Sequence, residues 1–288
     1  MRQRKIWAGL VLVLLCTLIM GMSVFAADAT MKNKKWVSGK GGAYVDSDKD
    51  GKIDDFQSWG KSYYKIQIPK QGYIVVEAKT SSLPGEKQYL EYINEDGDRN
   101  EEVDHSTSLF FLNAKKKQLA EHSDWLSGKN NLIFTAVVKK GTYYVAAEGD
   151  QKYQLRYSFT PVSKVSKTGK RPAKAVSLKK GKTVKSLITG DRDQYFKISL
   201  KKRSKVTLAF NARVRAAMMD GLGIQFLIKK GNVCKVIDEK GKLVSKGILY
   251  YNEVTGKTKV TVTLPKGTYY IRAFAWEGTG GYYTMKWR

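Results

Sequence analysis

The most specific chemical pattern in the sequence is an aspartate-rich loop in the first quarter of the chain. Calcium-binding loops of the EF-hand type place oxygen ligands at positions 1, 3 and 5, a glycine at 6, a backbone carbonyl at 7 and a further ligand at 9. Here Gly51 occupies position 6. The candidate ligands are Asp46, Asp48, Asp50, the backbone carbonyl of Lys52, and Asp54. We therefore predict a calcium site, with calcium as the expected cofactor.

The same loop departs from the full pattern at position 12. A bidentate acid normally stands there, and this sequence has Gln57. Asp55, or an acid of the cluster between residues 95 and 104, could take its place. The loop is similar to the calcium loops of thrombospondin type 3 and dockerin repeats, although a dockerin needs two loops and this chain has one. The alternative is a solvated acidic loop that leads into the first strand.

Residues that would support catalysis are few. Both histidines, His105 and His122, lie beside acids in polar stretches, and Cys234 is the one cysteine after residue 26. The sequence contains neither a His-Glu-x-x-His motif nor a Gly-x-Ser-x-Gly motif. We expect a non-catalytic protein, with Cys234 as a buried apolar residue. The first half of the chain holds many carboxylates, and two of them could pair as they do in a glycoside hydrolase. An enzyme of unknown class is therefore an alternative.

Positive charge is concentrated in the second half of the chain. Residues 28–162 hold 20 Lys plus Arg against 19 Asp plus Glu, whereas residues 163–288 hold 29 against 7. Such asymmetry indicates an anionic partner for the second half. The candidate polyanion-binding residues are Lys201, Lys202, Arg203, Lys205, Lys229, Lys230, Lys235, Lys240 and Lys242. The alternative is a generally basic, solvated surface without a specific partner.

Aromatic residues near the C-terminus form a second candidate binding surface. Rings can stack on the faces of sugars, and a glycine-rich stretch at 276–282 begins and ends with such rings. The candidate glycan-stacking residues are Trp276, Tyr282, Tyr250 and Tyr251. Tyrosine and tryptophan at strand ends also serve simply in core or edge packing.

An internal repeat organises the elements that must position these residues. Four pairs of segments match in order: 63–68 with 195–200, 112–117 with 237–242, 138–145 with 264–271, and 153–157 with 283–287. Apolar and polar residues alternate with a period of two in segments such as 259–264 and 205–210, which is typical of half-buried strands. Helical periodicity is nearly absent; residues 114–125 are the one candidate, and the repeat favours a hairpin there. The sequence thus predicts an all-β chain of two tandem jelly-roll or β-sandwich domains.

The repeat also resembles a known family, the bacterial pre-peptidase C-terminal domain. Asp191, Asp193, Phe196, Lys197 and Ile198 match its opening motif in the second copy. Segments 141–145 and 267–271 and both final strands match the rest; the first copy departs at its opening, where Ser58-Trp59-Gly60 replaces the acidic residues. The resemblance implies jelly-roll sandwiches of an exported protein, similar to collagen- and carbohydrate-binding modules. Members of this family usually accompany a catalytic domain, and none is left over here.

The N-terminal residues predict export. Arg2, Arg4 and Lys5 precede an uncharged run at 6–22, and Val24-Phe25-Ala26 offers a cleavage pattern. We expect residues 1–26 to be a removed signal peptide, with a retained anchor as the alternative. The expected division is then an N-terminal segment (27–60) with the aspartate-rich loop, a first sandwich (61–162), a linker (163–175) and a basic second sandwich (176–288).

Together these observations predict a secreted, non-catalytic binding protein, extracellular or cell-wall associated. Its expected partner is an anionic cell-wall polymer or polysaccharide, since export and the absence of a nucleic-acid-binding motif argue against nucleic acid. No membrane span is expected once the signal is cleaved. The alternatives are a lectin-like module for neutral glycans and an accessory protein that binds a secreted protease.

Overall fold

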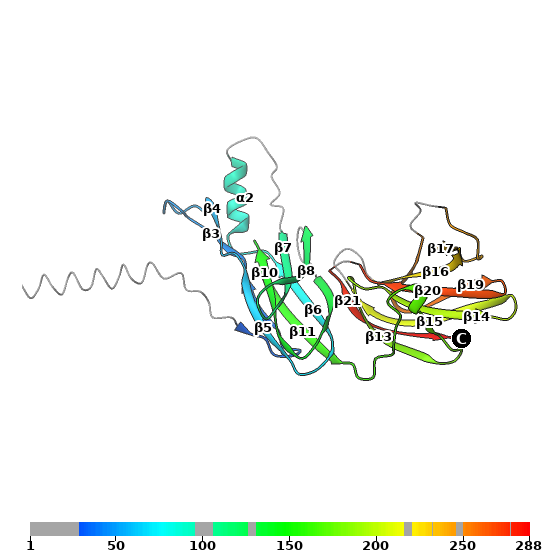
Figure 1. Cartoon of the computed structure of the whole chain (residues 1–288). Coiled ribbons are helices and arrows are strands. Elements are labelled where there is room, and N and C mark those ends of the chain that lie inside the picture. Colours follow the sequence, from blue (N-terminus) through cyan, green and yellow to red (C-terminus); the bar gives the residue numbers. More distant parts are fainter. Residues whose placement is uncertain are drawn as a thin grey trace, which may run out of the picture.

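The computed structural model describes residues 29–95, 106–125, 131–215, 221–231, 233–245, 250–276 and 278–288. The expectation of an all-β chain with tandem sandwiches is confirmed (Figure 1). Residues 1–26, the predicted signal segment, lie outside the described residues, as do His105 and most of the acidic cluster at 95–104. Among the described residues, no helix has the length and apolar character that crossing a membrane would need.

The first sandwich consists of a five-stranded and a four-stranded sheet. The larger sheet has the order β1 (Ala29–Thr30), β5 (Ser62–Ile68), β10 (Gly141–Gly149), β7 (Ser106–Asn113) and β8 (Gln118–Trp125). The smaller has the order β2 (Val37–Lys40), β11 (Lys152–Pro161), β6 (Gly72–Ser81) and β9 (Asn131–Val138). Alternation along the strands turns Ile66, Phe134 and Leu155 into the shared core. Because β1 and β2 pair with β5 and β11, this sandwich begins before residue 61, the boundary that the sequence indicated.

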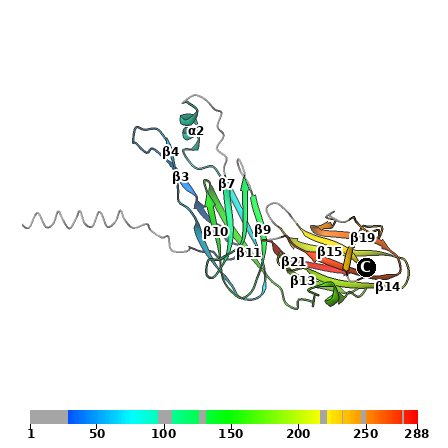
Figure 2. The same ribbon diagram turned by 45° about the horizontal axis from the view of Figure 1, so that its top comes forward.

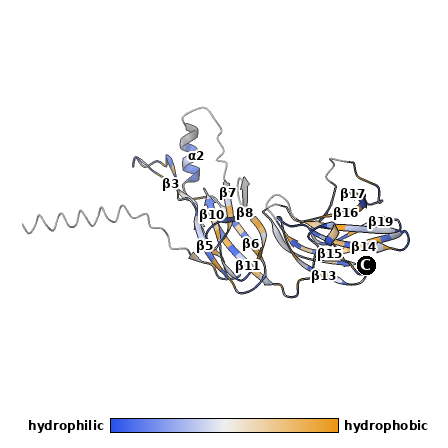
Figure 3. Ribbon diagram, in the orientation of Figure 1, coloured by the Kyte–Doolittle hydropathy of each residue, from blue (hydrophilic) through white to orange (hydrophobic). Residues whose placement is uncertain are grey.

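The second sandwich repeats this plan. Its larger sheet has the order β12 (Val176–Ser177), β14 (Gln194–Leu200), β20 (Gly267–Phe274), β16 (Leu222–Lys230) and β17 (Val233–Ile237), with β18 (Asn252–Val254) also paired to β16. The facing sheet has the order β13 (Thr183–Thr189), β21 (Gly280–Trp287), β15 (Ser204–Val214) and β19 (Gly256–Leu264). Phe196, Ile271 and Met285 lie in the core between them. Hydropathy coloured on the ribbon alternates along these strands (Figure 3).

Strand register shows which repeat landmarks are equivalent positions. Gly141 pairs with Ile68 in the first sandwich and Gly267 pairs with Leu200 in the second, so these two landmarks coincide. The landmark at 112–117 and 237–242 does not, because the first turn follows β7 and the second follows β17. Its two members share a turn conformation instead. In each, the side-chain Oδ1 of the first turn residue, Asn113 or Asp238, accepts from the N–H groups two and four residues later.

A short hairpin and a helix project from the first sandwich beside one another (Figures 1 and 2). The hairpin is β3 (Gly42–Val45) and β4 (Asp55–Ser58), and the helix is α2 (Glu86–Glu95). The buried Tyr44 ring joins them, with its centroid 5.1 Å from Phe56 and 5.1 Å from Tyr89. The sequence did not predict α2, since ten residues are too few to show a helical period clearly. Residues 114–125 do form a hairpin turn and strand, as expected.

Direct hydrogen bonds connect the two sandwiches. The buried Thr135 of β9 donates its N–H to the carbonyl of Arg215 (3.0 Å) and its hydroxyl to the carbonyl of Gly280 (2.6 Å). Arg215 N–H donates back to Thr135 Oγ1 (2.8 Å). Beside these bonds Tyr73 stacks on Tyr282, with ring centroids 5.7 Å apart and planes 5° from parallel. The contact therefore combines satisfied polar groups with aromatic packing.

Candidate functional site

The aspartate-rich loop connects β3 to β4 and brings three of its predicted ligands together. Carboxylate oxygens of Asp46, Asp48 and Asp50 lie within 4.8 Å of one another. Backbone N–H groups shape the loop: Gly51 donates to Asp46 Oδ2 (2.8 Å), and Lys52 donates to Asp50 Oδ1 (2.8 Å). Gly51 has φ +94°, a backbone conformation that residues other than glycine rarely adopt. Oxygen ligands at this spacing suit a hard divalent cation such as Ca²⁺.

Asp54 is positioned differently from the prediction. Its Oδ1 accepts from the N–H of Ser47 (2.7 Å) and its Oδ2 from the Ser47 hydroxyl (2.7 Å). These hydrogen bonds hold the pKa of the Asp54 carboxyl below its usual range. Asp54 therefore closes the base of the loop and does not belong to the three-carboxylate cluster. With Gln57 at position 12 as well, the residues fit a calcium site with few protein ligands.

Calorimetric titration of the full chain with CaCl₂ is expected to give weak binding, with a Kd of about 10⁻⁴–10⁻³ M, typical of extracellular modules. Asp48→Asn should abolish the binding heat, because it removes one of three converging charges. Asp54→Asn, an equal change of charge in the same loop, should leave the Kd within about threefold of the original, since Asp54 bonds to Ser47. Absence of binding heat, or equal losses in both variants, would show that the loop is only a solvated turn.

Seven of the nine predicted polyanion-binding residues meet at one end of the second sandwich. Topology requires this: β14 ends at Leu200 opposite Gly267, and β15 begins at Ser204 opposite Leu264. The N–H of Gly181 bonds to the carbonyl of Trp287, which brings a further turn to the same end. We define the basic tip as Lys179, Lys180, Lys182, Lys201, Lys202, Arg203, Lys229, Lys230, Lys240, Lys242, Lys266 and Arg288.

Every cation of the basic tip is exposed. Within the described part of the chain, none of them forms an ion pair with an acid. The two acids of the same end are bonded to other groups. Asp238 Oδ1 accepts from two backbone N–H groups, and Glu239 accepts from the Tyr250 hydroxyl, which lowers the pKa of Glu239. These bonds keep both carboxylates ionised, and two negative charges stand against the twelve cations of the tip, so the positive charge at this end is largely uncompensated.

Sequence reasoning found part of the basic tip. Seven of the nine predicted residues belong to it, while Lys205 and Lys235 are exposed on β15 and β17. Lys179, Lys180 and Lys182 were missed, although Lys-Lys-Gly-Lys is a turn signal that the strand order would bring to this end. Cys234 lies half-buried on β17, where burial raises the pKa of its thiol.

The four predicted glycan-stacking rings do not form one platform. Tyr282 stacks on Tyr73 within the contact between the sandwiches. Tyr251 and Trp276 do lie together, with ring centroids 5.3 Å apart, and Phe274 completes this group at 5.3 Å from Trp276. Tyr250 is separate from these rings, since its hydroxyl bonds to Glu239. The aromatic cluster is thus Tyr251, Phe274 and Trp276. Phe274 was not predicted and is buried beneath the other two, so Tyr251 and Trp276 are the partly exposed rings of this cluster.

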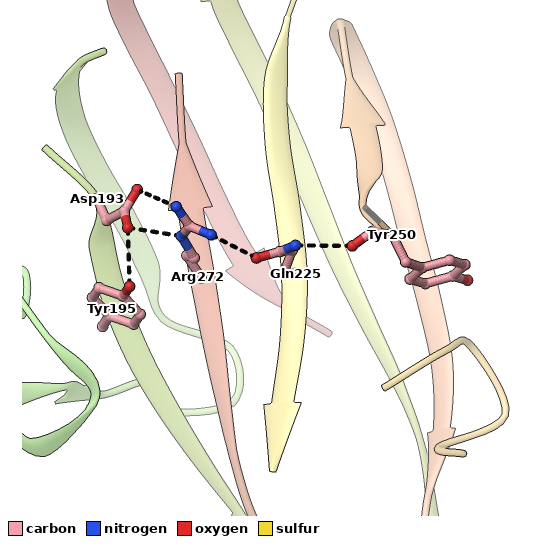
Figure 4. Close-up of polar contacts among 5 residues, drawn as sticks. All are labelled: Asp193, Tyr195, Gln225, Tyr250 and Arg272. Atoms are coloured by element: carbon pink, nitrogen blue, oxygen red, sulfur yellow. Dashed lines mark hydrogen bonds and ion pairs between the residues drawn. The ribbon is translucent and has the colours of Figure 1, made fainter. Parts of the chain in front are cut away.

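A polar network crosses the outer face of β14, β20 and β16 next to these rings (Figure 4). Arg272 donates to both carboxylate oxygens of Asp193 (Nε 2.7 Å, Nη2 3.1 Å) and to Gln225 Oε1 (3.0 Å). Gln225 in turn donates to the carbonyl of Tyr250 (3.0 Å). Tyr195 donates to Asp193, and burial together with this hydrogen bond raises the pKa of Tyr195 to about 12. The bond from Gln225 holds the Tyr250 segment in place. Asp193 neutralises the charge of Arg272, so the network leaves no free charge for a ligand.

The first sandwich has no such network at the equivalent place. Cross-strand register puts Ala146 at the position of Arg272 and Phe110 at that of Gln225. Both belong to a small apolar cluster with Leu112 and Tyr144. The two copies therefore share topology while their outer faces have diverged.

Comparisons with known proteins add little to this geometry. No protein-family model and no curated protein matches the chain. Tandem CBM51 modules of a family 98 glycoside hydrolase from Streptococcus pneumoniae are similar at 10% identity, covering 91% of this chain and 96% of theirs, with a TM-score of 0.22. A vicilin from Solanum melongena is similar at 8% identity, covering 88% and 82%, with a TM-score of 0.13. Scores this low carry no argument about function.

Proposed function

We propose that this chain is an exported, non-catalytic binding protein that attaches to an anionic polymer through the basic tip. The observation that carries this proposal is the convergence of twelve exposed cations, without ion pairs among the described residues, on one end of the second sandwich. A concentrated positive field attracts polyanions and raises their local concentration. The signal-like N-terminus, and the resemblance of both copies to pre-peptidase C-terminal domains, support an acidic cell-wall polymer or acidic polysaccharide as the partner.

A second candidate function is binding of a neutral glycan on Tyr251 and Trp276, which Phe274 supports from below. The specific observation in its favour is that these rings lie together beside an ordered polar network. Stacking on sugar faces depends on contact area and does not require charge. Salt dependence therefore distinguishes the two functions.

The test is co-sedimentation of the full chain with an insoluble acidic polysaccharide and with an insoluble neutral one, across a salt series. We expect binding to the acidic polymer at about 0.05 M salt and its loss by about 0.5 M, as the Debye length falls to a few ångströms. Trp276→Ala should leave this binding unchanged. Salt-resistant binding to the neutral polymer that disappears in Trp276→Ala would replace the proposal with the glycan-stacking function.

A further inference from the structure

The two copies differ sharply on the outer face of the smaller sheet. In the first sandwich, Arg156 of β11 bonds to Glu77 of β6 through Nε (2.8 Å) and Nη2 (2.7 Å). The Arg156 guanidinium also lies 4.5 Å from the centroid of the Trp36 ring. At this position of the first sandwich, the charge of Arg156 is therefore compensated by Glu77 and its guanidinium is covered by the Trp36 ring.

In the second sandwich the acid of this pair is missing. Cross-strand register places Ala209 at the position of Glu77 and Lys286 at that of Arg156. Lys286 is exposed and forms no ion pair among the described residues. Replacement of a carboxylate by a methyl group both opens space and leaves a positive charge uncompensated.

A hollow of about 350 Å³ occupies this place. Lys259 and Lys286 flank Ala209 on its two sides, because both are its cross-strand partners. One row further along, Lys257 and Thr284 flank Asn211 in the same way. We call this site the lysine hollow: Ala209, Asn211, Lys257, Lys259, Thr284 and Lys286. Its volume is within the range of small-molecule sites, about 300–1,000 Å³.

Asn211 adds an observation that points to a ligand. Its side-chain Oδ1 is buried, yet it accepts no hydrogen bond in the described part of the chain. A buried acceptor without a donor is unfavourable, so such atoms are normally satisfied by a partner. Asn211 lines the hollow, so rotation of its side chain would present Oδ1 to a ligand hydroxyl that supplies the donor.

We propose that the lysine hollow binds one sugar unit that carries an anionic group, a carboxylate, sulfate or phosphate. The ammonium groups of Lys257, Lys259 and Lys286 hold the anion, and a sugar hydroxyl donates to Asn211. The site lies on the face of the sheet and shares Arg288 of its lining with the basic tip. The proposal does not require that the tip bind a polymer. The lysine hollow recognises a single residue of a saccharide, whereas the tip attracts a polymer by its overall charge.

The test uses NMR titration of the ¹⁵N-labelled full chain with three probes: glucuronate, glucose and acetate. Glucuronate carries both the hydroxyls and the carboxylate, glucose carries only the hydroxyls, and acetate carries only the carboxylate. We expect glucuronate to shift the amide signals of residues 209–211 and 284–286, with a Kd at least about tenfold below those of glucose and acetate. Acetate or glucose binding as tightly as glucuronate, or no shift with any probe, would overturn the proposal.

The decisive variant is Ala209→Glu, which restores the carboxylate that the first sandwich has at this position. We expect it to pair with Lys286 and to weaken glucuronate binding at least about tenfold. Ser199→Glu on the exposed face of β14 adds the same charge to the other sheet and should change the Kd by less than about twofold. Lys286→Gln should reproduce the loss without adding an acid. Retained binding in both hollow variants would overturn the proposal, whatever polymer binding shows.

Discussion

Replacing Lys201, Lys202 and Arg203 by glutamate is expected to weaken binding of the full chain to an acidic polymer by about 100-fold at 0.1 M salt. The three residues form the turn between β14 and β15, and all are exposed at the basic tip. Reversal changes the local charge by six units at a distance from the polymer shorter than the Debye length, about 10 Å at this salt concentration. Fluorescence anisotropy with a labelled acidic oligosaccharide would measure the change.

The chain offers a matched control for this variant. Lys167, Lys170 and Arg171 of the linker have the same composition and are equally exposed. Their reversal to glutamate gives the same net charge but leaves the tip intact, so we expect affinity to fall by less than about threefold. Equal losses in the two variants would mean that binding follows net charge alone and that the tip is not a site.

Replacing Gln194 by leucine is expected to lower the free energy of unfolding of the second sandwich by about 3–5 kcal/mol, because several buried polar groups lose their partner at once. Gln194 Oε1 accepts from Ser186 Oγ (2.8 Å) and from the hydroxyl of the fully buried Tyr283 (2.7 Å). Its Nε2 donates to the carbonyl of Leu187 (2.7 Å). Leucine fills a similar volume but satisfies none of these groups.

A double variant separates the lost hydrogen bonds from a change in packing. Tyr283→Phe, added to Gln194→Leu, removes one stranded hydroxyl, so it should recover about 1–2 kcal/mol of what the single replacement costs. Urea unfolding monitored by circular dichroism would measure each step. The first sandwich is an internal reference, since Tyr153 at the equivalent position bonds to Tyr64 (3.1 Å) and is independent of Gln194. A cost below about 1 kcal/mol for Gln194→Leu would contradict this account.

Period-two alternation and the repeat were sufficient to predict the all-β class and the tandem sandwiches, because both are properties of residues close in sequence. They could not show whether two matching segments occupy the same place in the two sandwiches or only share the same type of turn. Asn113 and Asp238 share a turn chemistry that any hairpin can use, so their match carried no topological information. Helix α2 was missed because its stability depends on packing of Tyr89 against Tyr44, a contact outside the local pattern.

The candidate sites were predictable to the extent that they depend on local spacing. Asp46, Asp48 and Asp50 converge as their alternation indicates, while Asp54 bonds to Ser47, which the spacing did not show. Tyr282 was assigned to a sugar platform because nothing in its neighbourhood reveals that Tyr73 covers it. The lysine hollow could not be predicted at all. Its defining feature is an acid that the first copy has and Ala209 lacks, which register alone makes visible.

The bonds of Thr135 also have a mechanical consequence. The linker does not add slack to this joint, because Ser166 bonds to Lys185 of β13 and Gly169 bonds to Tyr195 of β14. The aspartate-rich loop therefore lies at one end of a rigid pair of sandwiches, and the basic tip lies at the other end (Figure 1). A chain bound to a surface through its tip would therefore hold its first sandwich at a fixed distance and in a fixed orientation from that surface, which a flexible linker would not do.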